Sequence, residues 1–147
     1  MSLRESYLEF TALSNYFKGF SLLLIRIALA YGFYEPALMK WSNIEATVEW
    51  FTSLGIPFPI FSTFLVASFE VIAVVLLLLG FFTRFIAIPI MIIMLVAIFT
   101  VHIQNGFSVG NNGFEIPFYY FLFLSILATH GAGQYSIDYR FTKKEER

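Results

Sequence analysis

The sequence contains no cysteine among its 147 residues. This absence excludes a structural disulfide, a CxxC redox pair, a thiolate zinc site and a thiolate-held iron–sulfur cluster. Any redox chemistry therefore depends on a bound cofactor or on the thiols of a partner. Charge is also scarce, because only 13% of the residues are charged, whereas a soluble domain has about 25%. The net charge of -1 gives no basis for nucleic acid binding.

Apolar residues take the place of the missing charges. They make up 59% of the chain, and the mean hydropathy is +0.76. They form continuous runs at residues 20–39, 60–80, 84–104 and 116–130. Twenty helical residues rise about 30 Å, which is the thickness of the bilayer hydrocarbon. The sequence therefore predicts an all-α membrane protein, a bundle of four transmembrane helices in one domain over residues 1–147.

Helix-terminal residues support these boundaries. Pro59 precedes the second run and Gly80 closes it, as expected for the first and last positions of a helix. The loop between the first two runs, WSNIEATVEWFTSLGIPFP, has apolar residues at helical spacing beside Trp41 and Trp50. Tryptophan favours the headgroup region of a bilayer. The loop therefore predicts a short helix lying on the membrane interface.

Lysine and arginine predict the orientation of the bundle. With four spans, both termini and the loop near residue 84 share one side. Only Lys40 lies on the opposite side. Positive residues favour the cytoplasmic side, so both termini are predicted to be cytoplasmic and the loop with Lys40 periplasmic. The cations of the cytoplasmic side are Arg4, Lys18, Arg84, Arg140, Lys143, Lys144 and Arg147.

Two ionisable residues lie within the runs. Arg26 is in the inner half of the first run and Glu70 is near the middle of the second. A charge at mid-membrane costs about 2.5–3.5 kcal/mol on insertion scales, so such residues face the protein interior and pair. An Arg26–Glu70 ion pair is one interpretation, because sequential antiparallel helices are usually neighbours. The other is that Glu70 carries a proton or binds a ligand.

Three further polar residues fall at the outward ends of the runs: Glu35, His102 and Glu115. Arg26 and Glu35 lie on opposite faces of an ideal helix, but Pro36 can kink that turn and swing Glu35 inward. One hypothesis is therefore a shared polar pocket on the periplasmic side. The alternative gives each residue a local role, with Glu35 paired to Lys40, His102 bonded to a loop carbonyl and Glu115 favouring a helix N-terminus.

One face of the third run carries Met91, Met94 and His102. Thioether and imidazole groups together suit Cu(I), although methionine is also ordinary apolar filler. The chain also has eight tyrosines and nineteen phenylalanines. These predict mainly packing and interfacial positions, and a few of them are candidates for lining a quinone slot. Quinone and copper therefore both stay open as cofactors.

Several segments in a fixed order resemble the DoxX family of four-helix membrane proteins. They are LIRIALAYGF followed by an acidic residue, LGIPFP, a glutamate in the second run, LGFFTR, a histidine before NGF, then GFE and HGAGQYSID. AYGFYEPALMKW and NNGFEIP resemble the HvfX-type branch, whose members are similar to proteins encoded beside copper-binding ribosomal peptides. The resemblance implies a bacterial inner-membrane protein that works with a protein partner. It carries over to Arg26, Glu35, Glu70, Arg84, His102 and Glu115.

Three functions follow from this pattern. The first is an accessory membrane subunit that serves a partner in metal-binding peptide maturation, copper handling or redox delivery. The second is a quinone-linked oxidoreductase subunit, which the resemblance relates to thiosulfate:quinone oxidoreductase. The third is a small metal or solute transporter, acting as a homo-oligomer. The bilayer is a partner in each case, and no complete catalytic constellation decides whether the chain is an enzyme.

Overall fold

The computed structural model describes the backbone of residues 2–145 and the side chains of residues 2–143, and every regular element in that range is helical. Arg147, counted above among the cytoplasmic cations, lies outside this range. Short non-α turns follow α4, a π-helical turn at Ile98–His102 and 3-10 turns at Ile103–Asn105 and Val109–Asn111. The α-helices are α1 (Leu3–Ser42), α2 (Ile44–Ser53), α3 (Pro59–Leu79), α4 (Thr83–Ala97), α5 (Glu115–His130) and α6 (Ile137–Glu145).

Within residues 2–145, three helical stretches are long and apolar enough to cross a membrane. They are Leu3–Ser42, Pro59–Leu79 and Thr83–Asn105. This confirms an all-helical membrane protein with long apolar helices over the first three predicted runs. The fourth run forms α5, which is apolar but only 16 residues long.

The predicted ends of α3 are confirmed. Pro59 occupies its first turn, and Gly80 ends it in the left-handed conformation with φ of 65°. The backbone N–H of Phe81 then donates to the carbonyl of Leu76 at 3.0 Å, which satisfies one of the last carbonyls of the helix. The chain reverses within these few residues, so α3 and α4 pack as antiparallel neighbours.

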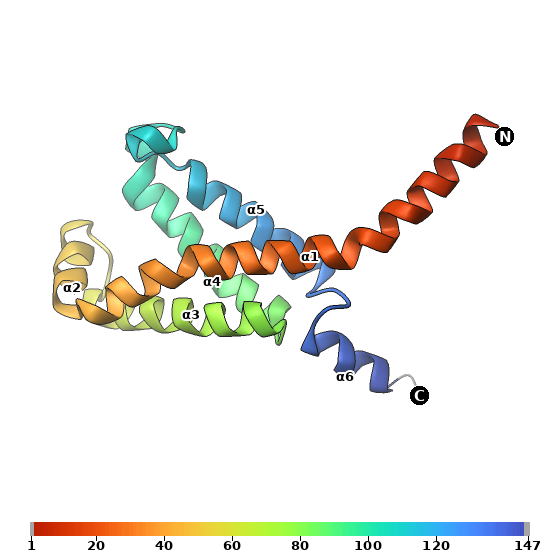
Figure 1. Cartoon of the computed structure of the whole chain (residues 1–147). Helices are drawn as coiled ribbons and strands as arrows, with labels where there is room; N and C mark the ends of the chain where they lie inside the picture. Colours follow the sequence, from red (N-terminus) through yellow and green to blue (C-terminus); the bar gives the residue numbers. More distant parts are fainter. Residues whose placement is uncertain (1, 146–147) are drawn as a thin grey trace.

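Helix α1 is much longer than the run that predicted it. Its 40 residues rise about 60 Å, roughly twice the hydrocarbon thickness. Its buried face begins at Gly19 and continues through Leu22, Arg26 and Leu29, at the spacing of one helix face. Figure 1 shows the N-terminal part of α1 extending away from the other helices.

The core lies where α1, α3, α4 and α5 meet. Helix α1 packs mainly on α3, and α4 packs on both α3 and α5. The apolar side chains with no exposed surface come from all four helices and fill the space between them. The largest of them are Leu29, Leu77, Ile90, Leu124 and Leu127.

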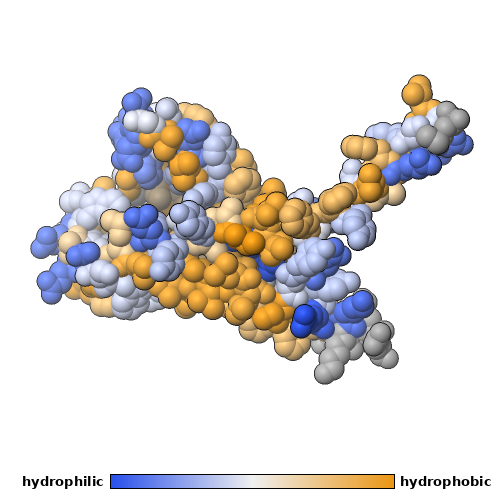
Figure 2. Space-filling view, in the orientation of Figure 1, coloured by the Kyte–Doolittle hydropathy of each residue, from blue (hydrophilic) through white to orange (hydrophobic). Residues whose placement is uncertain are grey.

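The exterior of the bundle is apolar as well. Figure 2 shows hydrophobic surface over the middle of the bundle, with hydrophilic residues gathered toward its two ends. Such an exterior is stable in lipid and unfavourable in water, so these helices contact the bilayer. Exposed residues of this surface include Leu24, Ile27, Ile72, Val75, Leu78, Ile88 and Ile92. We call the bundle end that carries α2 the α2 end, and the opposite one the α6 end.

Candidate functional site

A cavity of about 560 Å³ opens at the α2 end of the bundle. Helices α1, α3, α4 and α5 and the α2 loop all contribute to its walls, which are mostly apolar. Aromatic rings form part of the wall, since Trp50 and Phe51 of α2 line it together with Tyr120 of α5. The polar side chains with charge or proton-carrying groups that line it are Lys40, Glu70, His102 and Tyr120.

An ion pair between Lys40 and Glu70 is the central polar feature of this cavity. The Lys40 Nζ lies 2.9 and 3.1 Å from the two carboxylate oxygens of Glu70. The side chains are only 17% and 4% exposed, respectively. The indole Nε1 of Trp41 also donates to the Ala67 carbonyl at 3.1 Å, which holds the end of α1 against α3 beside the pair.

The expected Arg26–Glu70 ion pair does not form. Arg26 is fully buried and its Nη2 donates to the Tyr135 carbonyl at 2.5 Å. The reason is the register of the antiparallel helices α1 and α3. Arg26 lies level with Gly80 at the α6 end, where its guanidinium occupies the space that a side chain at that position would need. Glu70 lies ten residues earlier on α3, about 15 Å along the axis, level with Lys40.

Glu35 does not join the predicted cluster. It is exposed and does not line the cavity. Helix α1 continues through Pro36, and it is Pro36 and Lys40, four residues apart, that face the cavity. Adjacent helical residues differ by about 100° in direction, so Glu35 points away. The expected kink therefore does not bring Glu35 to His102, and Lys40 pairs with Glu70 instead of Glu35.

Glu115 and His102 both bind the loop that joins α4 to α5. A Glu115 carboxylate oxygen accepts from the backbone N–H of Val109 at 2.9 Å. His102 Nδ1 donates to the Asn112 carbonyl at 2.8 Å, and Asn105 donates to the same oxygen at 3.2 Å. His102 also lines the cavity, whereas Glu115 does not. With Nδ1 as the donor, a neutral His102 keeps Nε2 as an acceptor.

The π-helical turn Ile98–His102 ends at this histidine. Such turns are wider than an α-turn and are often found at functional sites. Here the turn changes the direction in which the end of the third span presents its side chains. Residues 98–102 contain no Pro or Gly that would mark a change of helix type. The sequence therefore contains no signal for this turn.

Met91 and Met94, predicted to share one helix face with His102, differ in their contact with the cavity. Met94 is buried and lines the cavity with His102, while Met91 is half-buried and does not line it. Met94 and His102 are eight residues apart, a rise of about 12 Å, so the role of these side chains in binding copper stays a prediction from the sequence. Among the side chains of residues 2–143, His, Cys, Asp and Glu form no group of three or more suited to a metal.

Two residues of the cavity, Lys40 and Tyr120, were not predicted from the sequence. Lys40 is the one cation of the side predicted to be periplasmic. The sequence predicts it at the membrane interface, with Glu35 as its candidate partner. The Tyr120 hydroxyl closely approaches Gly32 and fills the space that any side chain there would occupy, and its ring lies 5.3 Å from that of Phe33. The glycine in AYGF was the available signal for this close approach.

The sequence is similar to a known protein family and to individual bacterial proteins. The family model described as DoxX matches residues 21–103, which include Lys40, Glu70 and His102. An uncharacterized protein of Haemophilus influenzae is 35% identical over 128 residues, 82% of each chain. The Bacillus subtilis protein named "Putative oxidoreductase CatD" is 32% identical over 117 residues, 79% of this chain and 83% of its own.

A shorter match links the chain to the Escherichia coli protein named "Inner membrane protein YphA". The two are 38% identical over 63 residues, 43% of this chain and 45% of YphA. No solved structure matches the chain. The family match covers more than half of the sequence and includes helices that build the cavity, so this chain belongs to the DoxX family of membrane proteins.

Proposed function

We propose that the chain is an accessory membrane redox subunit that binds a quinone-type ligand in the cavity beside Lys40 and Glu70. The observation that carries this proposal is an apolar, partly aromatic cavity of about 560 Å³ with an ion pair in its wall. Small-molecule sites typically measure about 300–1,000 Å³ and combine apolar walls with few polar groups. A quinone head needs the same combination, a flat apolar slot and donors for its carbonyl oxygens.

The polar groups of the cavity suit the proton chemistry of such a ligand. Reduction of a quinone to a quinol consumes electrons and protons in equal number. Glu70 and His102 line the cavity and are able to carry protons, and the hydroxyl of Tyr120, which lines the same cavity, supplies a donor. We assign the electrons to a redox-active group of a partner protein. The similarity to the Bacillus subtilis protein named as an oxidoreductase, CatD, supports a redox role. The copper-linked role remains a prediction from the sequence.

The proposal includes four membrane spans with both termini cytoplasmic, in the inner membrane. Helix α5 would be the fourth span. Its 16 residues rise about 24 Å, which leaves a few ångströms for local thinning of the bilayer. The excess of Lys and Arg at the α6 end supports the orientation, and the match to YphA supports the location. The cavity then opens on the periplasmic side, with α2 at the interface.

A cavity-filling substitution tests the ligand. Ala97 lines the cavity, so Ala97→Phe places a ring in the proposed slot. The full chain is purified in nanodiscs and titrated with a short-chain ubiquinone analogue, with binding followed by quenching of tryptophan fluorescence. We expect the wild type to bind and Ala97→Phe to weaken binding by about tenfold or more, equivalent to about 1.4 kcal/mol.

Ala28→Phe is the matched control, because Ala28 is exposed on the outside of α1 and does not line the cavity. It should bind like the wild type. Equal binding by all three proteins, or none by the wild type, would reject the quinone site. Copper bound at one ion per chain, without quinone, would favour the metal-handling role instead.

A further inference from the structure

A second cavity, of about 710 Å³, lies at the α6 end of the bundle. Its walls come from the part of α1 near Lys18, the α3–α4 turn, the start of α4, the segment that joins α5 to α6, and α6 itself. It is separate from the proposed quinone site, because the two cavities share no lining residue. Nothing in the proposed redox role requires it.

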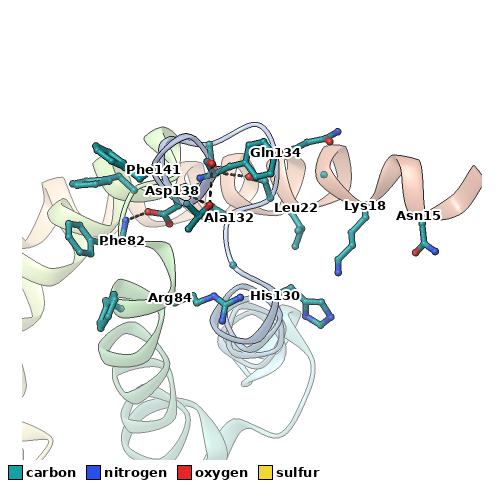
Figure 3. A pocket seen from close by; sticks show the side chains of 18 residues that line it. Asn15, Lys18, Leu22, Phe82, Arg84, His130, Ala132, Gln134, Asp138 and Phe141 are labelled. Atoms are coloured by element: carbon teal, nitrogen blue, oxygen red, sulfur yellow. Dashed lines mark hydrogen bonds between the residues drawn. The ribbon is translucent and has the colours of Figure 1, made fainter. Parts of the chain in front are cut away.

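Two cations and a histidine line this cavity, each from a different element: Lys18 of α1, Arg84 of α4 and His130 of α5. Figure 3 shows Lys18 pointing from α1 toward the region where Arg84 and His130 lie. Among the side chains of residues 2–143 the one salt bridge is Lys40–Glu70, so none of these three is ion-paired there. The guanidinium of Arg84 lies over Gly131 at the end of α5.

The cavity wall also contains an acidic residue, Asp138, whose carboxylate is hydrogen-bonded to the backbone. The Asp138 carboxylate accepts from the backbone N–H of Phe82 at 2.8 Å and from that of Thr83 at 3.0 Å. These are the first N–H groups of α4, where a negative charge is favourable. The charge of Asp138 is therefore balanced by the helix start, and Figure 3 shows its carboxylate directed at the backbone of Phe82.

Aromatic side chains border the same cavity. Phe82, Phe85 and Phe141 line it and are 50%, 72% and 61% exposed. They are continuous with the apolar exterior of α3 and α4, which faces lipid. A soluble anion gains nothing from such a border, whereas acyl chains would cover it. Basic pockets between helices at a membrane surface are typical sites for anionic lipid headgroups.

We propose that this cavity binds the phosphate headgroup of an anionic phospholipid, with Arg84 and Lys18 contacting phosphate oxygens and the acyl chains lying along Phe82 and Phe85. His130 contributes a further donor at the rim. Guanidinium and ammonium groups are the usual partners of phosphate. The site would tie α1, α4 and α5 together at the membrane surface through one lipid.

The test measures lipid retention by the full-length protein. Wild type, Arg84→Gln and Lys18→Gln/Arg84→Gln are reconstituted in nanodiscs of phosphatidylcholine with a minor fraction of fluorescent phosphatidylglycerol. Energy transfer to the labelled lipid from a dye on a cysteine introduced in every protein at Ser14, an exposed residue of α1 beside the lining residue Asn15, reports local enrichment. The chain has no other cysteine, so the dye attaches at that one position. We expect about a fivefold weaker apparent affinity for Arg84→Gln and about 25-fold for the double variant, since each cation near an anionic surface contributes about fivefold.

Lys143→Gln is the matched control, since Lys143 is a cation of the same end that does not line the cavity. It should retain the lipid like the wild type. Equal retention by the double variant would overturn the proposal, and so would displacement of the lipid by millimolar inorganic phosphate, which would indicate a soluble anion instead. A second test needs no variant: the unfolding temperature of the wild type is measured in phosphatidylglycerol and in phosphatidylcholine. We expect a higher unfolding temperature in phosphatidylglycerol, and equal temperatures would count against the proposal.

Discussion

At the scale of single residues, the polar groups inside this bundle are held in distinct ways. Glu70 is neutralised by Lys40. Arg26 is bound through one nitrogen to the Tyr135 carbonyl, while its Nε and Nη1 have no hydrogen-bond partner within residues 2–143. The bundle therefore buries charge in two places: the Lys40–Glu70 pair at the α2 end and Arg26 at the α6 end.

The Lys40–Glu70 pair gives the first prediction at this scale. Glu70→Gln leaves the Lys40 ammonium half-buried without its counter-ion, and Lys40→Met leaves the carboxylate in the same state. Removing one partner of a buried pair typically costs about 3–5 kcal/mol, whereas replacing both by apolar groups is often neutral. We therefore expect each single variant to lower the free energy of unfolding strongly, and Lys40→Met/Glu70→Leu to recover most of it, measured by helix loss in detergent titrations.

Glu35→Gln is the control for this series, because Glu35 is exposed on the same helix as Lys40. Its stability should match the wild type. A double variant as unstable as the two single variants combined would show that the two side chains do not act as a pair.

At the scale of elements, the register between α1 and α3 decides where each charge lies. Gly80 fixes this register at the α6 end. It has a φ of 65°, and the Arg26 guanidinium occupies the space beside its Cα. A larger residue therefore meets both backbone strain and a buried cation.

Gly80→Ala tests this arrangement, with Gly55→Ala as the matched control. Gly55 has a similar φ of 72°, but no atom lies within 4 Å of the point that a Cβ there would occupy. The left-handed conformation alone costs alanine about 1–2 kcal/mol. We expect Gly55→Ala to lose only that amount and Gly80→Ala to lose about 1–3 kcal/mol more from overpacking, measured by the same unfolding titration. Equal losses would mean that Arg26 moves aside freely.

The sequence predicted the elements better than their contacts. Run length and hydropathy predicted α3 and the helical stretch Thr83–Asn105 closely, and Pro59 and Gly80 marked the ends of α3. The Lys40–Glu70 pair was not predicted, because which residues are level on antiparallel helices depends on loop lengths and packing that no single run contains. The predicted position of Glu35 was wrong because it required a kink at Pro36, whereas α1 remains helical through that residue.

At the scale of the whole molecule, the two ends of the bundle differ in chemistry. The α2 end has an apolar cavity with a neutral ion pair, and the α6 end has a cavity rich in cations. The proposed topology puts the first on the periplasmic side and the second on the cytoplasmic side. It also requires α5 to cross the bilayer.

Reporter fusions test this topology. Alkaline phosphatase, which is active only outside the cytoplasm, is inserted in the loop at Gly110 or fused after the last residue. We expect activity from the loop insertion and none from the terminal fusion, with green fluorescent protein giving the opposite result. Activity of the phosphatase at both positions would show that α5 does not span, and the reverse pattern would invert the bundle.

The hydrogen bond from Arg26 to the Tyr135 carbonyl joins residues 109 positions apart. At about 5–20 residues per second, the ribosome makes Tyr135 between about 5 and 20 s after Arg26. During that interval the first helix carries a cation whose final acceptor does not yet exist. The final position of the Arg26 guanidinium is therefore reached only after Tyr135 has been synthesised. Until then we expect this guanidinium to stay near lipid headgroups or water.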